Sequence, residues 1–134
     1  MRLAAALLLL AAPVLADADA AASAYKIEST KGPLKLKKGA EGKAHVEVVP
    51  RSNAHVSPDA PISLTVSAAP GLKVAKARLG RTDAKETEAK GVSFDVPFTA
   101  DSSGELKSTL SFFICTEKLC EKQKAELALM VQVE

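Results

Sequence analysis

Residues 108–134 read STLSFFICTEKLCEKQKAELALMVQVE, and this stretch determines the fold that we expect. Before the first cysteine, every second residue is apolar, with Leu110, Phe112 and Ile114 in one row. After the second cysteine the same period returns in Leu127, Leu129, Val131 and Val133. Successive side chains of a β-strand point to opposite faces, so a period of two indicates strands with one buried face. The stretch therefore predicts two strands joined by a tight connection.

Cys115 and Cys120, the only two cysteines, lie where these strands meet the connection. They flank residues 116–119, a length that suits a hairpin loop, and residues opposite each other in a hairpin are close enough to form a disulfide. A ring of about six residues stabilises a fold by roughly 2 kcal/mol in the loop-entropy model, so the bond is a weak staple. A short, accessible ring also favours exchange with other thiols. The sequence leaves both interpretations open, a structural disulfide and a redox pair.

The side chains around the pair give further expectations. Cys115 shares a face with Phe113 and lies opposite the core row, which predicts a thiol near the surface. Neighbouring charges are mixed, since Lys118 and Lys122 favour a thiolate and the glutamates beside them oppose it. The direction of their net effect on the thiol remains open.

The two cysteines and two histidines of the chain make four potential metal ligands. His45 and His55 lie far upstream of the C-x4-C pair, and this is not a standard zinc spacing. We interpret His45 as a residue on the polar face of a strand and His55 as a loop residue. The sequence therefore predicts neither a metal nor a cofactor.

The N-terminus is typical of an export signal. Arg2 precedes an apolar run of alanine and leucine, and small residues follow Pro13. The run is shorter than the ~20 residues of a membrane span. We expect a signal peptide over residues 1–16, with cleavage possible up to residue 24. The exported chain is expected to be periplasmic or secreted and not to span a membrane.

The remaining sequence, residues 25–134, has the length of one domain. Its lysines are interspersed with acidic residues and the formal net charge of the whole chain is +2, which does not favour nucleic acid as a partner. The sequence shows no Ser/His/Asp set and no glycine-rich phosphate loop, so hydrolase and nucleotide chemistry have no support.

A period of two recurs along this domain. It predicts strands around residues 43–49, 62–68 and 92–99, and a further strand over residues 72–79. Pro97 cannot donate to a ladder, which predicts that its strand, or that end of it, lies at a sheet edge. Residues 81–90 are polar and predict a loop. Together these signals predict an all-β fold, an immunoglobulin-like antiparallel β-sandwich of about seven to nine strands.

Four stretches in order resemble a known family. Asn53-Ala54-His55-Val56 followed by Pro61, residues 67–74 with a Pro-Gly turn, residues 94–98 and residues 111–120 are similar to segments of the amino-terminal periplasmic domain of the thiol:disulfide interchange protein DsbD. That family has an immunoglobulin-like domain with a reactive cysteine pair on its last hairpin. Its usual aromatic cap loop corresponds to residues 81–90, which hold no aromatic residue.

The resemblance implies a function. Cys115 and Cys120 would exchange electrons with thioredoxin-like periplasmic proteins after reduction by a membrane-embedded partner, with the attacking cysteine unassigned. The alternative is a non-catalytic immunoglobulin-like binding or structural domain whose last hairpin is stapled by the same bond. Whether the chain is an enzyme, a thiol:disulfide oxidoreductase, depends on this choice.

Overall fold

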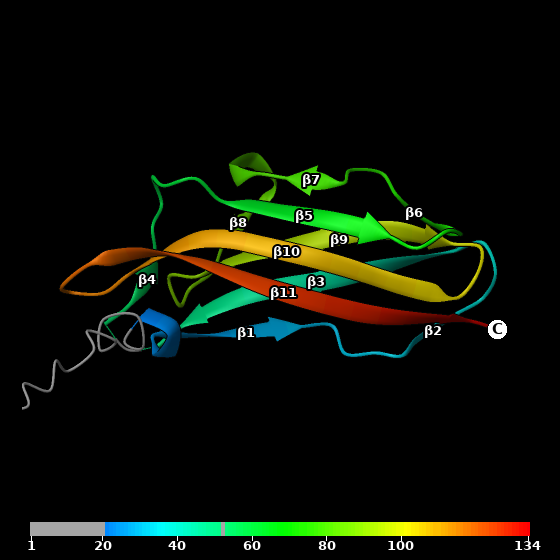
Figure 1. Ribbon diagram of the computed structural model, residues 1–134, viewed down its shortest axis with the longest axis horizontal. Coiled ribbons are helices and arrows are strands. Elements are labelled where there is room, and N and C mark those ends of the chain that lie inside the picture. The colour runs from blue at the N-terminus through cyan, green and yellow to red at the C-terminus, as the bar shows by residue number, and fades with distance from the viewer. Residues whose placement is uncertain (1–20, 52) are drawn as a thin grey trace, which may run out of the picture.

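The computed structural model describes residues 21–51 and 53–134, in which two β-sheets pack face to face (Figure 1). The expected signal peptide, residues 1–16, lies outside the described residues. The three longest strands, β3, β10 and β11, run along the long axis of the molecule. The last hairpin crosses the front of the view in Figure 1.

Sheet I contains five strands. Their order is β1 (Tyr25–Ser29), β3 (Ala40–Pro50), β9 (Val92–Ala100) and β6 (Leu72–Val74), and β8 (Lys85–Glu86) also pairs with β9. All of these pairings are antiparallel.

Sheet II contains six strands. Their order is β2 (Leu34–Leu36), β11 (Cys120–Val133), β10 (Gly104–Cys115), β5 (Ser63–Ala68) and β7 (Arg78–Leu79), and β4 (His55–Val56) pairs with one end of β10. The β2–β11 pair is parallel, and the others are antiparallel.

This topology is that of an immunoglobulin-like sandwich. The order β1, β3, β9, β6 reproduces the A, B, E, D sheet of that fold, and β5, β10, β11 reproduce the C, F, G sheet. The predicted fold class is confirmed. The described residues form eleven strands where seven to nine were expected, and three of them, β4, β7 and β8, contain only two residues each.

The core lies between the sheets and is built from the alternating apolar rows. Phe94 of sheet I and Phe112 of sheet II are almost completely buried, and burying such a side chain contributes about 1.5–3 kcal/mol. Other buried members of the two inner faces include Val46, Val48, Val92, Val96, Leu64, Leu106, Leu110, Ile114, Leu129 and Val131. The period of two in the sequence therefore marks the core correctly.

The expected strand over residues 72–79 is wrong as a single element. Leu72 pairs with sheet I at Ala100, whereas Leu79 pairs with sheet II at Leu64. Residues seven apart on one straight strand point to opposite faces, yet both leucines are buried. Both leucines can face the core because the chain crosses from sheet I to sheet II between β6 and β7.

Pro97 lies in an interior strand whose end pairs with β6, so the expectation that this strand, or that end of it, lies at a sheet edge is wrong. On one side of β9, Pro97 is opposite Lys43 of β3. On the other side, β6 reaches only residues 98–100 and β8 only residues 92–93. No described strand pairs with residues 94–97 on that side, so Pro97 stands in a local gap of the sheet where a missing N–H is tolerated.

Candidate functional site

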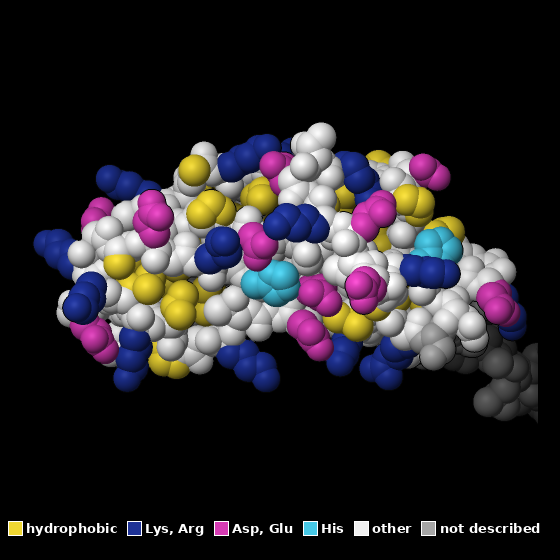
Figure 2. All heavy atoms as spheres, turned by 180° about the vertical axis from the view of Figure 1, so that it is seen from behind, with side chains coloured by type: hydrophobic (Ala, Val, Ile, Leu, Met, Phe, Trp, Pro, Cys, Tyr) yellow, Lys and Arg dark blue, Asp and Glu magenta, His cyan; other side chains and the backbone are white. Residues whose placement is uncertain are grey.

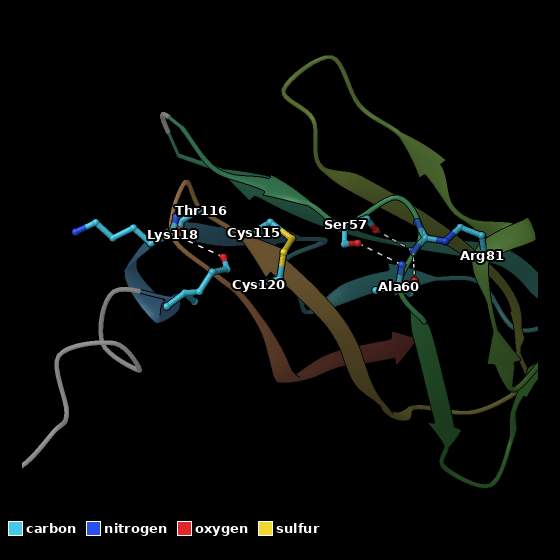
Figure 3. The surroundings of a disulfide bond; sticks show 8 residues. Ser57, Ala60, Arg81, Cys115, Thr116, Lys118 and Cys120 are labelled. Atoms are coloured by element: carbon cyan, nitrogen blue, oxygen red, sulfur yellow. Dashed lines mark hydrogen bonds between the residues drawn. A yellow bond between two sulfur atoms is a disulfide. The ribbon is translucent and has the colours of Figure 1, made fainter.

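The cysteine pair closes the hairpin between β10 and β11. Cys115 is the last residue of β10 and Cys120 the first of β11, and the two are direct partners in the ladder. Their sulfurs are bonded at 2.08 Å, and their Cα atoms are 4.0 Å apart. The bond that the spacing predicted is therefore present. Figure 3 shows it bridging the strands at the base of the turn, with Thr116 and Lys118 beyond it.

The turn fixes the geometry of this pair. The Thr116 N–H donates to the Leu119 carbonyl at 2.8 Å, which makes these two residues the hydrogen-bonded pair that closes the turn. Adjacent pairs of an antiparallel ladder alternate, so Cys115 and Cys120 form a non-hydrogen-bonded pair, the kind with the closer Cα atoms and side chains. The ladder therefore places both sulfurs on one face within bonding distance.

The two cysteines differ in exposure. Cys115 is 3% exposed, whereas Cys120 is exposed. The prediction of a surface thiol is therefore wrong for Cys115. Its side chain does point away from the core row, but β10 is an interior strand, with β4 on one side and β11 on the other. Cys120 begins β11 at the end where no described strand lies on its outer side, and it is exposed.

The segment beside Cys115 belongs to the site, and sequence analysis missed it. His55 is the ladder partner of Cys115 in β4, and the Ser57 N–H donates to the Phe113 carbonyl at 2.9 Å. The Arg81 guanidinium then donates to the carbonyls of Ser57, at 3.0 Å, and Ala60. Figure 3 shows Arg81 reaching this loop. Arg81 thus fixes the loop that follows β4.

A hollow of about 340 Å³ adjoins this segment. Its lining combines basic, acidic and apolar groups from β4, the loop after it and the segment before β9. The lining residues are His55, Val56, Pro58, Arg81, Glu86, Thr87, Lys90, Gly91 and Val92. His55 borders this hollow and is also the ladder partner of Cys115, whereas neither cysteine lines the hollow.

The histidines do not join the cysteines as a ligand set. His45 lies on the outer face of sheet I, where its Nδ1 is 2.8 Å from Asp95 Oδ1 and its Nε2 is 3.3 Å from Glu47 Oε1. The hydrogen bond to Asp95 raises the pKa of His45, and the same contact lowers the pKa of Asp95. Figure 2 shows acidic side chains around a histidine on this face.

Two further observations concern the described residues alone. Within residues 21–51 and 53–134, no three His, Cys, Asp or Glu side chains are grouped as metal ligands. Across that same part of the chain, no helix has the length and apolar character required to cross a bilayer.

The comparisons with known proteins find likeness in structure only. No protein-family model matches the chain, and no curated protein matches it. Similar solved structures include a complex of zinc 2-glycoprotein and prolactin inducible protein from human seminal plasma, with 12% identity, 81% of this chain and 93% of that chain covered, and a TM-score of 0.49.

Two others are a fimbrial subunit and a human domain. The AggA major subunit of aggregative adherence fimbriae from Escherichia coli shares 9% identity over 82% of this chain and 94% of its own, with a TM-score of 0.39. The PapD-like domain 7 of human CEP192 shares 11% identity over 100% of this chain and 96% of its own, with a TM-score of 0.38. The fold assignment given above rests on the strand pairings.

Proposed function

We propose that this chain is an exported thiol:disulfide exchange module that passes electrons through Cys115 and Cys120 to or from periplasmic thioredoxin-like proteins. The observation that carries the proposal is the unequal exposure of the pair: the bond is accessible from the Cys120 side and closed from the Cys115 side. The resemblance to the amino-terminal domain of DsbD supports the same role.

The exchange follows from this geometry. A partner thiolate attacks the Cys120 sulfur, the bond between the two cysteines breaks, and Cys115 leaves as a thiolate that takes up a proton. A second thiol of the partner then attacks the mixed disulfide and releases Cys120. The partner loses two electrons and this chain gains them, and the reverse sequence reduces the partner. A membrane-embedded reductant would supply the electrons in the cell.

Measurement of the reduction potential tests this proposal. We expect a value above about −300 mV, because exchanging disulfides lie above that level and structural ones below it. A value below it, together with resistance of the folded protein to a thioredoxin-like donor, would count against exchange.

Trapping with single-cysteine variants tests which sulfur is attacked. Cys115→Ser leaves the exposed Cys120 thiol and is expected to accumulate a mixed disulfide with a thioredoxin-like protein. The matched variant Cys120→Ser leaves the buried Cys115 thiol, and we expect roughly tenfold less adduct, because access limits attack. Equal trapping by the two variants would contradict the assignment of Cys120.

A second candidate function is a non-catalytic immunoglobulin-like binding or structural domain with a stapled hairpin. The burial of Cys115 favours it, since inert structural cysteines are buried. The reduction potential distinguishes the two candidate functions. A structural disulfide is expected to lie below about −300 mV and to resist reduction by a thioredoxin-like donor.

Export is part of the proposal and has its own test. The signal-like residues 1–16 predict that the mature protein begins after Ala16, or at the latest after Ala24. N-terminal sequencing of the protein recovered from the periplasm or medium gives the cleavage position. Recovery of the uncleaved chain from the cytoplasm alone would refute export.

A further inference from the structure

The outer edge of β11 is open over most of its length. β2 pairs with β11 only at residues 131–133, and no described strand pairs with the outer side of residues 120–130. The open edge ends at Met130, because the backbone of Gly32 lies against it: a Cβ atom on Gly32 would be 2.8 Å from the Met130 carbonyl oxygen. Residues 120–129, the free edge, therefore form a long unpaired strand edge beside the disulfide.

The hydrogen bonds identify which backbone groups face outward. On β10, the Phe113 carbonyl accepts a hydrogen bond from Ser57 on the β4 side. The backbone groups of the adjacent residues, Phe112 and Ile114, therefore face β11. On β11, the Glu134 N–H donates outward to Leu36 of β2. By the same alternation, the even-numbered residues from 120 to 128 direct their N–H and C=O groups to the free edge. One of these carbonyls, that of Lys122, accepts a bond from the Gln123 side-chain amide.

The side chains on this edge are charged in a self-complementary order. Lys122, Lys124 and Glu126 are exposed on the outer face, and the small Ala128 follows them. Opposite charges directly across an antiparallel pair are favourable, and like charges are unfavourable. If β11 of a second copy pairs antiparallel with this edge, the charges therefore favour one register over the others.

We infer that β11 pairs with β11 of a second copy of this chain, antiparallel and with Ala125 on the twofold axis. In this register Lys124 of each copy lies opposite Glu126 of the other, and both are residues whose backbone groups face outward. A shift of the axis to Lys124 or to Glu126 would place that residue against its own charge. The axis at Ala125 avoids both conflicts.

The same register explains an exposed apolar side chain. Met130 is 51% exposed, and it is the one large apolar side chain of the described residues that is exposed. About Ala125 the strands pair from residue 121 to residue 129, up to the point where Gly32 covers the Met130 backbone, so the Met130 side chain of one copy lies near the hairpin turn of the other. The contact removes part of the methionine from water. The interface is a continuous sheet across two sandwiches, as isologous dimers permit.

Sedimentation velocity over a range of concentrations tests the pairing. The purified protein is expected to show a monomer–dimer equilibrium. Lys124→Glu and Glu126→Lys are each expected to raise the dissociation constant about tenfold, because two attractive pairs become repulsive. The double variant restores both pairs and is expected to recover most of the affinity. A chain that stays monomeric at every concentration, or a dimer insensitive to these changes, would overturn the inference.

Disulfide trapping tests the register directly. In the proposed dimer the two copies of residue 125 form a non-hydrogen-bonded pair, about 4.5 Å between Cα atoms, which a disulfide can span. Ala125→Cys is therefore expected to form a covalent dimer under mild oxidation. The matched variant Ala128→Cys places the two thiols about 20 Å apart and is expected to stay uncrosslinked. Equal crosslinking of both variants, or of neither, would reject this register. Circular dichroism checks that each variant is folded.

Discussion

At the scale of single residues, the contact between His45 and Asp95 has a direct consequence for stability. His45 lies on the polar face of β3. Its partner Asp95 lies fifty positions away in the sequence, so no local pattern identifies the contact. His55 was expected in a loop and lies in the two-residue strand β4.

The His45–Asp95 contact predicts a pH dependence of stability. The pKa of His45 is raised, so the contact stabilises the fold fully below about pH 6.5 and is lost as the pH rises through the higher folded-state value. The pKa of Asp95 is lowered, so its contribution is present above about pH 4 and is lost as the pH falls. The side chains are 43% and 31% exposed, which limits the effect to below about 1 kcal/mol.

Urea unfolding at two pH values measures this effect. Asp95→Asn should lower the free energy of unfolding more at about pH 5.5 than at about pH 8, because His45 is charged in the first condition. Asp83→Asn serves as the control, since the hydrogen bond from Lys76 lowers the pKa of Asp83 and its contribution is lost only in acid. An Asp95→Asn effect equal at both pH values would contradict the prediction.

Gly91 and Gly80 give a second comparison at this scale. A Cβ atom on Gly91 would lie 2.0 Å from the Val48 carbonyl oxygen, a rigid backbone group in β3, whereas one on Gly80 would meet nothing within 4 Å. Gly91→Ala is therefore expected to destabilise the protein by about 1–3 kcal/mol through overpacking.

Thermal unfolding of the two alanine variants measures the difference. Gly80 has φ of −124°, which any residue adopts, so Gly80→Ala is expected to leave the stability within about 0.5 kcal/mol of the starting protein. Equal losses from the two substitutions would show that the close approach at Gly91 is unimportant.

At the scale of elements, the last hairpin follows from sequence and its neighbours do not. The alternation of residues 106–114 and 127–133 fixes which faces of β10 and β11 are buried. It carries no information on which strand lies alongside, and exposure of an outer-face residue depends on that strand. Cys115 is buried because β4 lies beside it, and β4 is too short to show a period in the sequence.

Reduction of the disulfide is expected to leave the hairpin folded. The bond closes a ring of six residues, so its loss costs about 2 kcal/mol, while the ladder between β10 and β11 pairs residues from Gly104 to Cys115. Urea unfolding with and without a reductant measures the difference.

A cysteine-free variant controls this experiment. The double variant Cys115→Ala with Cys120→Ala is expected to be folded and to unfold at the same urea concentration with and without reductant. Global unfolding of the native chain on reduction alone would show that the bond is an essential structural element.

At the scale of the whole molecule, the sandwich is predictable because the alternation of apolar and polar residues in each long strand identifies its buried face. Val92, Phe94, Val96 and Phe98 lie in one row of the sequence and in one buried row of β9. The crossing between β6 and β7 was not predictable, because residues 72–79 are too few to distinguish one strand from two pieces in different sheets. The hollow beside β4 was not predictable for a different reason, because it forms between segments far apart in the sequence.

Phe112 and Phe113 test the division between core and outer face. Phe112 is completely buried, and its ring lies 4.9 Å from that of Tyr25 in an edge-to-face arrangement that joins sheet II to β1. Phe112→Ala is expected to cost about 3–5 kcal/mol. Phe113 is only half-buried on the outer face, so Phe113→Ala should cost clearly less. Chemical denaturation compares the two, and equal losses would argue against the placement of the core.

The length of β11 separates the two ends of the molecule. Its fourteen residues span about 45 Å, and Figure 1 shows the hairpin tip and the C-terminus at opposite ends of the long axis. A bead, a biosensor surface or a fluorescent label attached to Glu134 therefore stands clear of the disulfide. Immobilisation through this residue leaves the hairpin tip with the exposed Cys120 toward the solution, where the proposed exchange with thiol partners can be measured.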